Sequence, residues 1–252
     1  MNENNRNLDW DGCHNIRDLG GLATVDSGRT RSGVFIRADL LGRLTPQGKQ
    51  QLLDYGVRTI VDLRSPQEIA ENPPPDFGDD PRAPLYINPP QENPRLEQGT
   101  SPAAAQLKKA KTRAELFNKL LDLYQGNQVQ ILRAIANAEP GGLIFHCHSG
   151  KDRTGLTAAL LLDLAGVEQD AIAADYAISQ DNLWPLYQQW VNEHGVEEDD
   201  PWLIPITDPQ TIHDMLGHLY DQYCGTEAYL LDAGLTAEEI GRLKFRLIDA
   251  QS

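Results

Sequence analysis

The 252-residue chain has only three cysteines and no long run of apolar residues. Cys13, Cys147 and Cys224 form a sparse, odd-numbered set, which argues against a disulfide framework and for reduced thiols in a cytoplasm. No stretch approaches the ~18 uninterrupted apolar residues that a membrane span needs. The first ten residues, MNENNRNLDW, lack the apolar core of a signal peptide. The sequence therefore predicts a cytoplasmic protein without a transmembrane segment, and it leaves open export by a route that needs no signal peptide.

Basic residues are also scarce, with 22 Lys and Arg against 37 Asp and Glu, which gives a formal net charge of −15. A nucleic-acid-binding protein needs a basic face, so nucleic acid is not an expected partner. Anionic membrane surfaces are disfavoured unless a local basic patch compensates. An anionic substrate is expected only where a few cations are concentrated in one place.

Length and composition predict a single α/β domain over residues 1–252, without repeats or low-complexity segments. Residues 33–39, 45–56 and 58–64 read as strand, helix and strand, a unit that implies parallel pairing. Thr45 and Pro46 mark the start of that helix, and Thr236 with Glu239 marks the start of the last one. Further helices are expected over 101–138 with a break at 125–127, over 171–195 and over 208–223.

Residues 146–155 read HCHSGKDRTG, and their flanks predict a strand, a tight loop and a helix. The apolar run 142–145 precedes them, and leucines at helical spacing follow as far as Gly166, a C-terminal cap. Such a loop turns its amide N–H groups and the positive end of the helix toward one point, which suits an anion. Cys147 and Arg153, with five residues between them, add a thiol and a guanidinium to that point.

The side chains of the loop indicate a phosphate and a nucleophile. Arg153 offers a planar fork that holds two phosphate oxygens at once. The loop amides, Lys151 and Arg153 favour the thiolate form of Cys147, which is the nucleophilic form. Ser149 and Thr154 are placed to donate hydrogen bonds to the sulfur or to the leaving oxygen. The residues expected around a bound phosphate are His148, Ser149, Gly150, Lys151, Asp152 and Arg153.

The C-x5-R pattern between a strand and a helix resembles the phosphate-binding loop of cysteine-dependent tyrosine and dual-specificity phosphatases. The longer pattern, H-C-x-x-G-K-D-R-T-G, is similar to that of bacterial tyrosine phosphatases that resemble lipid phosphatases. The resemblance implies a central, mostly parallel sheet flanked by helices, with a helical lid-like insertion. It implies hydrolysis of a phosphomonoester through a phosphocysteine intermediate, with no metal and no other cofactor. His146 is expected to fix the loop by hydrogen bonding rather than to act as a base.

Residues 15–21, NIRDLGG, also resemble this bacterial family. Together with the cysteine loop, they favour a supporting role for Arg17 or Asp18, in which the side chain positions residues of the site and does not contact the substrate. The alternative is a polar turn with an exposed Arg17–Asp18 pair.

Asp62 and Arg64 stand at the carboxyl end of the strand 58–64, where open α/β sheets place their sites. The resemblance favours a supporting position beside the phosphate loop, and the alternative is an internal ion pair that holds a turn.

Residues 72–100 are rich in proline, glycine and acidic residues, with one short strand expected at 85–87. A stretch of this kind inside a domain is usually a functional flap or a mobile loop. The resemblance implies, by position alone, that 72–138 covers the active site as a flap and helical lid.

Residues 175–179, DYAIS, are another family-like feature, for which the favoured interpretation is core packing by Tyr176 and Ile178. Trp184 and Trp190 are expected to be core anchors.

The leaving oxygen needs a general acid. Leu186 follows Trp184-Pro185, so the Trp-Pro-Asp loop of the well-studied tyrosine phosphatases is absent here. The Lys-Asp-Arg loop of the resembled family makes Asp152 the first choice and leaves Asp62 second. The remaining alternatives lie on the proline-rich segment: Asp76, Asp79 and Asp80.

Several rival functions were weighed against hydrolysis. A metal site at His146-Cys147-His148 is disfavoured by the cations beside it, and sulfur transfer or arsenate reduction fits the loop less well. A non-catalytic phospho-recognition module stays open. The expected substrate is a phosphotyrosine protein, and dual specificity is compatible with the loop. A phosphoinositide or inositol phosphate is the alternative that Lys151 favours.

Overall fold

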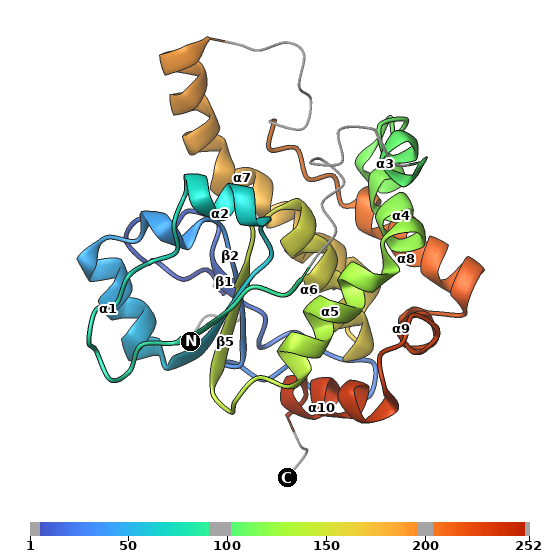
Figure 1. Cartoon of the computed structure of the whole chain (residues 1–252). Coiled ribbons are helices and arrows are strands. Elements are labelled where there is room, and N and C mark those ends of the chain that lie inside the picture. Colours follow the sequence, from blue (N-terminus) through green and yellow to red (C-terminus); the bar gives the residue numbers. More distant parts are fainter. Residues whose placement is uncertain (1–5, 91–101, 196–203, 250–252) are drawn as a thin grey trace.

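A five-stranded sheet forms the centre of the computed structural model, which describes residues 6–90, 102–195 and 204–249 (Figure 1). The strands lie in the order β1–β2–β5–β3–β4. β1 is antiparallel to β2, and every other neighbouring pair is parallel. Their bounds are β1 Arg17–Asp18, β2 Phe35–Ala38, β3 Val57–Asp62, β4 Leu85–Ile87 and β5 Gly142–His146. The predicted mostly parallel α/β sheet is confirmed.

Helices cover both faces of this sheet (Figure 1). Those before β5 are the short 3-10 helix η1 Leu41–Arg43, α1 Pro46–Tyr55, α2 Pro66–Glu71, α3 Pro102–Leu107, α4 Arg113–Leu123 and α5 Gln125–Ala136. Those after it are α6 Asp152–Leu164, α7 Gln169–His194, α8 Gln210–Tyr223, α9 Thr226–Asp232 and α10 Ala237–Leu247. The Thr45 and Thr236 caps occur as predicted, because each hydroxyl accepts from an amide of the first turn.

The alternating side chains of β5 divide the core between the two faces. Leu143 and Phe145 belong to the larger cluster, which α4 to α10 complete, whereas Ile144 packs with α1 through Leu52 and Leu53. This alternation is the two-residue period of a strand, and it explains why the run 142–145 is apolar throughout. β5 is therefore fixed from both sides before it reaches the cysteine.

Parallel pairing brings the carboxyl ends of three strands to one edge of the sheet. β5 lies between β2 and β3, with His146 in register with Ala38 and with Asp62. The residues that follow these strands are thereby gathered around the start of α6. This is the edge at which open α/β sheets bind ligands.

One feature of the helices differs from the sequence predictions. Trp184 is 39% exposed on α7, so its assignment as a core anchor is wrong. Its ring lies 5.7 Å from that of Tyr187, which in turn stacks at 6.5 Å on Trp190. α4 and α5 contribute side chains to the larger core cluster, Phe117 of α4 among them. No helix in the described ranges has the length and apolarity to cross a membrane.

Candidate active site

The loop that follows β5 holds a buried thiol at the start of an uncapped helix. Cys147 is 2% exposed and directly follows the strand. No side chain caps α6, and the amides of His148, Ser149 and Gly150 donate to no atom in the described part of the chain. Unsatisfied N–H groups at the positive end of a helix form an anion site. The backbone here is thus shaped for an anion beside the sulfur.

The second half of the loop rests on the end of β2. Gly150 has φ of 66°, and a Cβ at this position would lie 2.4 Å from the carbonyl oxygen of Ala38. Only glycine satisfies both the dihedral and the close approach. Two side chains also hold loop carbonyls: the Asn15 amide donates to Ser149 O at 3.0 Å, and Arg37 donates to Gly150 O at 2.8 Å. These contacts fix the outer turn of the loop against the sheet.

Asn15 and Arg37 belong to one buried ionic network. The guanidinium of Arg17 donates to Asn15 Oδ1 at 2.8 Å and to Asp175 Oδ1 at 3.0 Å. Arg37 donates to Asp175 Oδ2 at 2.7 Å, and Arg17 also reaches Ser179 Oγ at 3.1 Å. Burial alone raises the pKa of the Asp175 carboxyl, but Arg17 and Arg37 hold it far below its usual value. A permanently ionised Asp175 therefore ties the N-terminal segment and α7 to the loop.

Arg153 is held by a bidentate carboxylate that leaves one edge of its guanidinium to the loop. Nη1 and Nη2 each donate to Glu68 at 2.7 Å, and Nη1 also donates to Leu63 O at 3.1 Å. Guanidinium has five N–H groups, and Nε with the second Nη2 hydrogen forms the remaining fork. Such a fork matches two oxygens of a phosphate. Burial raises the pKa of Glu68, but the bonds and charge of Arg153 lower it to about 2.

Asp62 and Arg64 form a buried ion pair beneath the loop. Arg64 Nη2 lies 2.6 Å from Asp62 Oδ2, and the Tyr86 hydroxyl donates to the same oxygen at 2.8 Å. Although burial raises the pKa of Asp62, Arg64 and His146 bring it below the usual value. His146 Nδ1 lies 3.0 Å from the carbonyl oxygen of Cys147, and burial lowers the pKa of this imidazole. The ionised Asp62 fits an anchor better than a proton donor.

Lys151 and Asp152 form hydrogen bonds with residues of two other segments of the chain. Arg113, the first residue of α4, donates to Asp152 Oδ1 at 2.5 Å and to Ile204 O at 2.9 Å. Lys151, whose side chain is 2% exposed, donates to the same Ile204 carbonyl at 3.0 Å. The start of α4 and the segment before α8 therefore border the loop. Asp152 remains 23% exposed and accessible at this rim.

Comparison with known proteins agrees with this geometry. A model of the tyrosine phosphatase family matches residues 8–249. The chain belongs to that family. It is 33% identical over 225 residues to a tyrosine-protein phosphatase of Nostoc commune, which covers 84% of this chain and 74% of the relative. It is 27% identical over 278 residues to the triple specificity protein phosphatase PtpB of Mycobacterium tuberculosis, covering 92% and 96% of the two chains.

The other residues that the sequence predicts for the site of this tyrosine phosphatase family member lie partly at the loop and partly away from it. His148 is exposed on the loop, and Thr154 is fully buried on α6 with no partner for its hydroxyl among the described residues. Asp18 accepts from the amides of Gly20 and Gly33 and from Tyr55, so its contacts lie in the N-terminal turn rather than at the loop. The described residues contain no group of three or more His, Cys, Asp or Glu suited to a metal ion.

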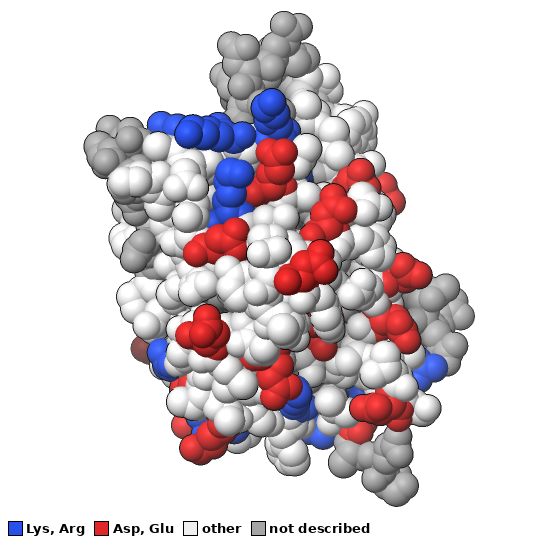
Figure 2. All heavy atoms as spheres, turned by 90° about the vertical axis from the view of Figure 1, so that its right-hand side faces the viewer, with Lys and Arg blue, Asp and Glu red and all other residues white. Residues whose placement is uncertain are grey.

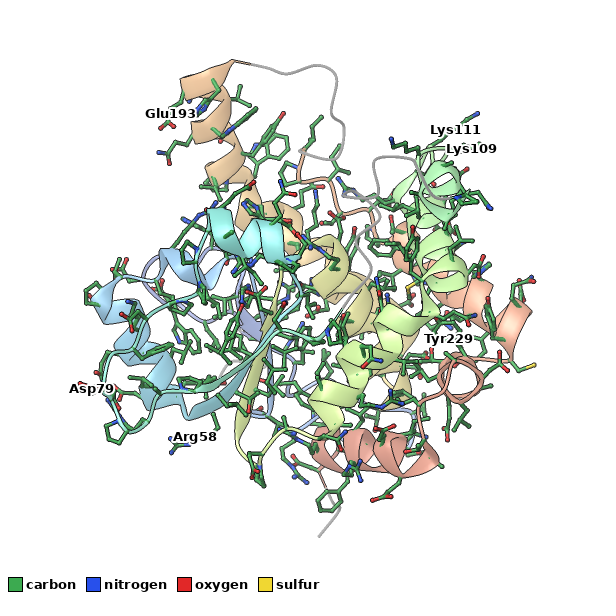
Figure 3. All side chains as sticks on the ribbon, viewed as in Figure 1. Arg58, Asp79, Lys109, Lys111, Glu193 and Tyr229 are labelled. Carbon is green, nitrogen blue, oxygen red and sulfur yellow. The ribbon has the colours of Figure 1, made fainter. Side chains whose placement is uncertain are left out.

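The acidic residues of the proline-rich segment lie away from the loop, beside α1. Lys49 of α1 donates to Asp76 O, and Arg82 joins Asp80 to Asp54 of α1. Figure 3 shows Asp79 at the same outer edge. The Cys13 sulfur donates to Asp39 at 2.7 Å, and burial followed by the Asp39 charge raises the pKa of this thiol. Cys224 is exposed at the end of α8.

A cavity of about 290 Å³ opens beside Arg153 on the side of α5. Leu63, Pro66, Pro90, Ile131 and Leu156 give it a mostly apolar wall. Cys147 is not among the lining residues. The cavity therefore continues outward from the Arg153–Glu68 pair rather than lying over the sulfur.

Four supporting residues escaped the sequence analysis: Asn15, Arg37, Glu68 and Asp175. Glu68 had a usable signal, because Ser65-Pro66 followed by Glu68 is the pattern of a capping box, which the structure contains. Asp175 lies in a stretch that was noticed and assigned to packing. Tyr176 does pack in the core, but the carboxylate beside it carries the ionic network.

Proposed function

We propose that this chain hydrolyses phosphotyrosine in proteins through a phosphocysteine at Cys147. The observation that supports it most is the buried sulfur before an uncapped helix start, with Arg153 in the first turn of that helix and one edge of its guanidinium not used by Glu68 or Leu63. Loop amides and Arg153 would bind the three equatorial oxygens and stabilise the charge that develops on them. A thiolate in this position is aligned to attack phosphorus in line.

The reaction divides into two displacements. In the first, the Cys147 sulfur forms a bond to phosphorus, the bond to the tyrosine oxygen breaks, and that oxygen takes a proton from Asp152. In the second, water attacks phosphorus, the sulfur leaves as thiolate, and the proton lost by the water returns to Asp152. Asp152, whose partner is Arg113, is proposed as the acid because it is 23% exposed at the rim, whereas Asp62 is fully buried beneath the loop in its pair with Arg64.

Phosphate release by the wild type and by Cys147→Ser tests the proposal. Three substrates are compared with chelator present: an aryl phosphate, a phosphotyrosine peptide and a phosphoinositide. We expect activity on the first two that survives the chelator and is lost in Cys147→Ser. Cys224→Ser, which changes an exposed thiol at the end of α8, is the matched control and should keep full activity. A protein that binds phosphate but releases none from any substrate would instead be a recognition module.

The role of Asp152 is tested with aryl phosphates whose leaving groups differ in acidity. Loss of a general acid costs about 10²- to 10⁴-fold where the leaving group needs a proton. Asp152→Asn should therefore slow the release of poor leaving groups strongly and that of nitrophenol little. Equal loss across the series would assign Asp152 a role in shaping the loop instead.

A phosphoinositide or inositol phosphate is the second candidate substrate. Lys151 favours it, because a second cation in the loop suits a substrate that carries more than one phosphate. The relative from Mycobacterium tuberculosis is named a triple specificity phosphatase, which is consistent with a broad range of substrates in this family. A higher kcat/KM on the phosphoinositide than on the peptide would support this candidate over the first.

A further inference from the structure

Three lysines at the junction of α3 and α4 stand out on an acidic molecule. Lys108, Lys109 and Lys111 are exposed, and none has a carboxylate within ion-pair distance in the described ranges. Figure 3 shows Lys109 and Lys111 pointing outward at the tip of this junction. Several exposed cations elsewhere are paired with carboxylates, as in Arg82–Asp54, Arg242–Glu238, Lys244–Glu227 and Arg31–Asp249. We name these three residues the lysine patch.

The lysine patch lies on a face that carries acidic side chains over its middle and further basic ones toward its lower end. Figure 2 shows Lys and Arg side chains gathered near the upper end of this face, with Asp and Glu spread over its middle. Against a formal net charge of −15, an uncompensated group of cations creates a local field that attracts anions. A broad anionic surface such as a membrane would also meet the carboxylates below. A narrow acidic segment would contact the lysines alone.

Chain connectivity places the lysine patch close to the phosphate loop. Lys111 precedes Arg113 by two residues, and Arg113 contacts both Asp152 and the Ile204 carbonyl at the rim. Consecutive Cα atoms are ~3.8 Å apart, so all three lysines lie within about 19 Å of the Arg113 Cα. An extended peptide advances ~3.3–3.6 Å per residue. Counted from Arg113 at the rim, that bound corresponds to at most about six extended residues, so residues several positions from a phosphotyrosine in the loop would reach the patch.

We propose that the lysine patch docks acidic residues that flank the phosphotyrosine of a protein substrate. This inference rests on the proposed phosphatase function and adds a preference for sequence around the target tyrosine. The patch contacts neither the thiol nor the loop, so it acts on the binding of the substrate rather than on the chemical step. Its attraction is electrostatic and exposed, and it therefore weakens as salt shortens the Debye length from ~10 Å at 0.1 M to ~3 Å at 1 M.

The test compares three substrates on the full chain: an aryl phosphate, a phosphotyrosine peptide with Asp or Glu three to six positions on either side, and the same peptide with Asn or Gln there. The variant K108Q/K109Q/K111Q removes the patch. Arg58→Gln removes an exposed cation at the opposite end of the molecule and serves as the control (Figure 3). Binding of both peptides to the Cys147→Ser protein gives Kd values that need no turnover.

Wild type is expected to prefer the acidic peptide through a lower KM and a lower Kd. An exposed ion pair contributes roughly a factor of two, so the triple variant should lose about eightfold on that peptide. The activity of the triple variant on the aryl phosphate and on the neutral peptide should stay unchanged, and Arg58→Gln should match wild type on all three substrates. The preference of wild type for the acidic peptide should vanish at 1 M salt.

Two peptides bound and cleaved alike by wild type would overturn the docking proposal, as would equal losses by the triple variant on all three substrates. Lysine-dependent binding to vesicles of anionic lipid, without any peptide preference, would assign the patch to a membrane instead. Failure of wild type on the aryl phosphate would count against the proposed function, while the Kd values would still decide the docking surface.

Discussion

Individual side chains set the orientation of the groups that would bind phosphate, and Glu68 does so for Arg153. The carboxylate accepts one hydrogen bond from Nη1 and one from Nη2, which fixes the plane of the guanidinium and leaves Nε and one Nη2 hydrogen for a phosphate. Glu68 also closes the capping box of α2 by accepting from the Ser65 amide. One residue thereby couples the first turn of α2 to the phosphate loop.

Glu68→Gln should lower kcat/KM on an aryl phosphate by about ten- to a hundredfold, the cost of misplacing a group that must meet the transition state. Glutamine keeps a cap at this position, so α2 should persist and the loss should arise from Arg153. Steady-state kinetics with circular dichroism at matched temperature measure both quantities. Glu71→Gln, exposed on the same helix, is the control. Full activity in Glu68→Gln would mean that Arg153 is oriented without its carboxylate.

Replacing Asp175 is expected to lower the free energy of unfolding. It is 1% exposed and is shared by Arg17 and Arg37, so Asp175→Asn leaves two buried guanidinium groups without a countercharge. Removing one partner of a buried ion pair costs about 3–5 kcal/mol. Urea unfolding should show that loss, together with reduced phosphatase activity because Arg37 also holds Gly150. Asp170→Asn changes a 97% exposed carboxylate on the same helix and should leave the free energy of unfolding nearly unchanged.

Among the elements, the loop and the strand end beneath it form one rigid unit. At Gly150 a Cβ would overlap the Ala38 carbonyl, and the positive φ disfavours any other residue. Gly150→Ala should therefore displace the loop and reduce kcat/KM by about a hundredfold. Gly126→Ala, in α5 with open space around the added methyl group, should keep activity and gain up to about 1 kcal/mol of stability. Comparable activity in the two variants would show that the loop tolerates a shift at Gly150.

The residues of the phosphate loop could be predicted from the sequence, whereas several residues that hold the loop in place could not. Cys147 to Arg153 were predicted because strand, loop and helix start are contiguous, and their chemistry can be read from ten residues. Arg37 and Asp175 lie 138 positions apart, and Arg17 and Asp175 lie 158 apart. A motif within one short stretch of sequence cannot reveal pairs of residues that are so far apart in the chain. Likewise α2 and α9, with 6 and 7 residues, are too short for hydrophobic periodicity to reveal.

For the molecule as a whole, charge is divided between buried ion pairs around the loop and a surface with an excess of carboxylates. Arg17, Arg37, Arg64 and Lys151 are all buried around the loop, whereas the formal net charge of the chain is −15. The surface carboxylates repel one another at neutral pH, and this repulsion disfavours the compact state. The buried carboxylates act in the opposite sense, because their ionised forms are stabilised by neighbouring cations.

This division predicts a stability maximum near pH 5. As pH falls from 7 toward 5, the first surface carboxylates gain protons and repulsion declines. Asp62, Glu68 and Asp175 have folded-state pKa values below their unfolded values. Each therefore contributes stability that is present above its unfolded pKa and is lost as pH falls toward its folded pKa. For Glu68, a fall from 4.5 to about 2 corresponds to roughly 3 kcal/mol.

Urea unfolding at constant ionic strength, at pH 7, 5, 4 and 3, measures this profile. The free energy of unfolding should be level or slightly higher at pH 5 than at pH 7, and it should drop steeply below pH 4. Glu68→Gln cannot lose the contribution of an ionised carboxylate, so its curve should fall less steeply than that of wild type in the acid range. A wild-type stability that keeps rising below pH 4 would mean that surface repulsion outweighs the buried ion pairs, and that the carboxylates around the loop contribute little to holding it.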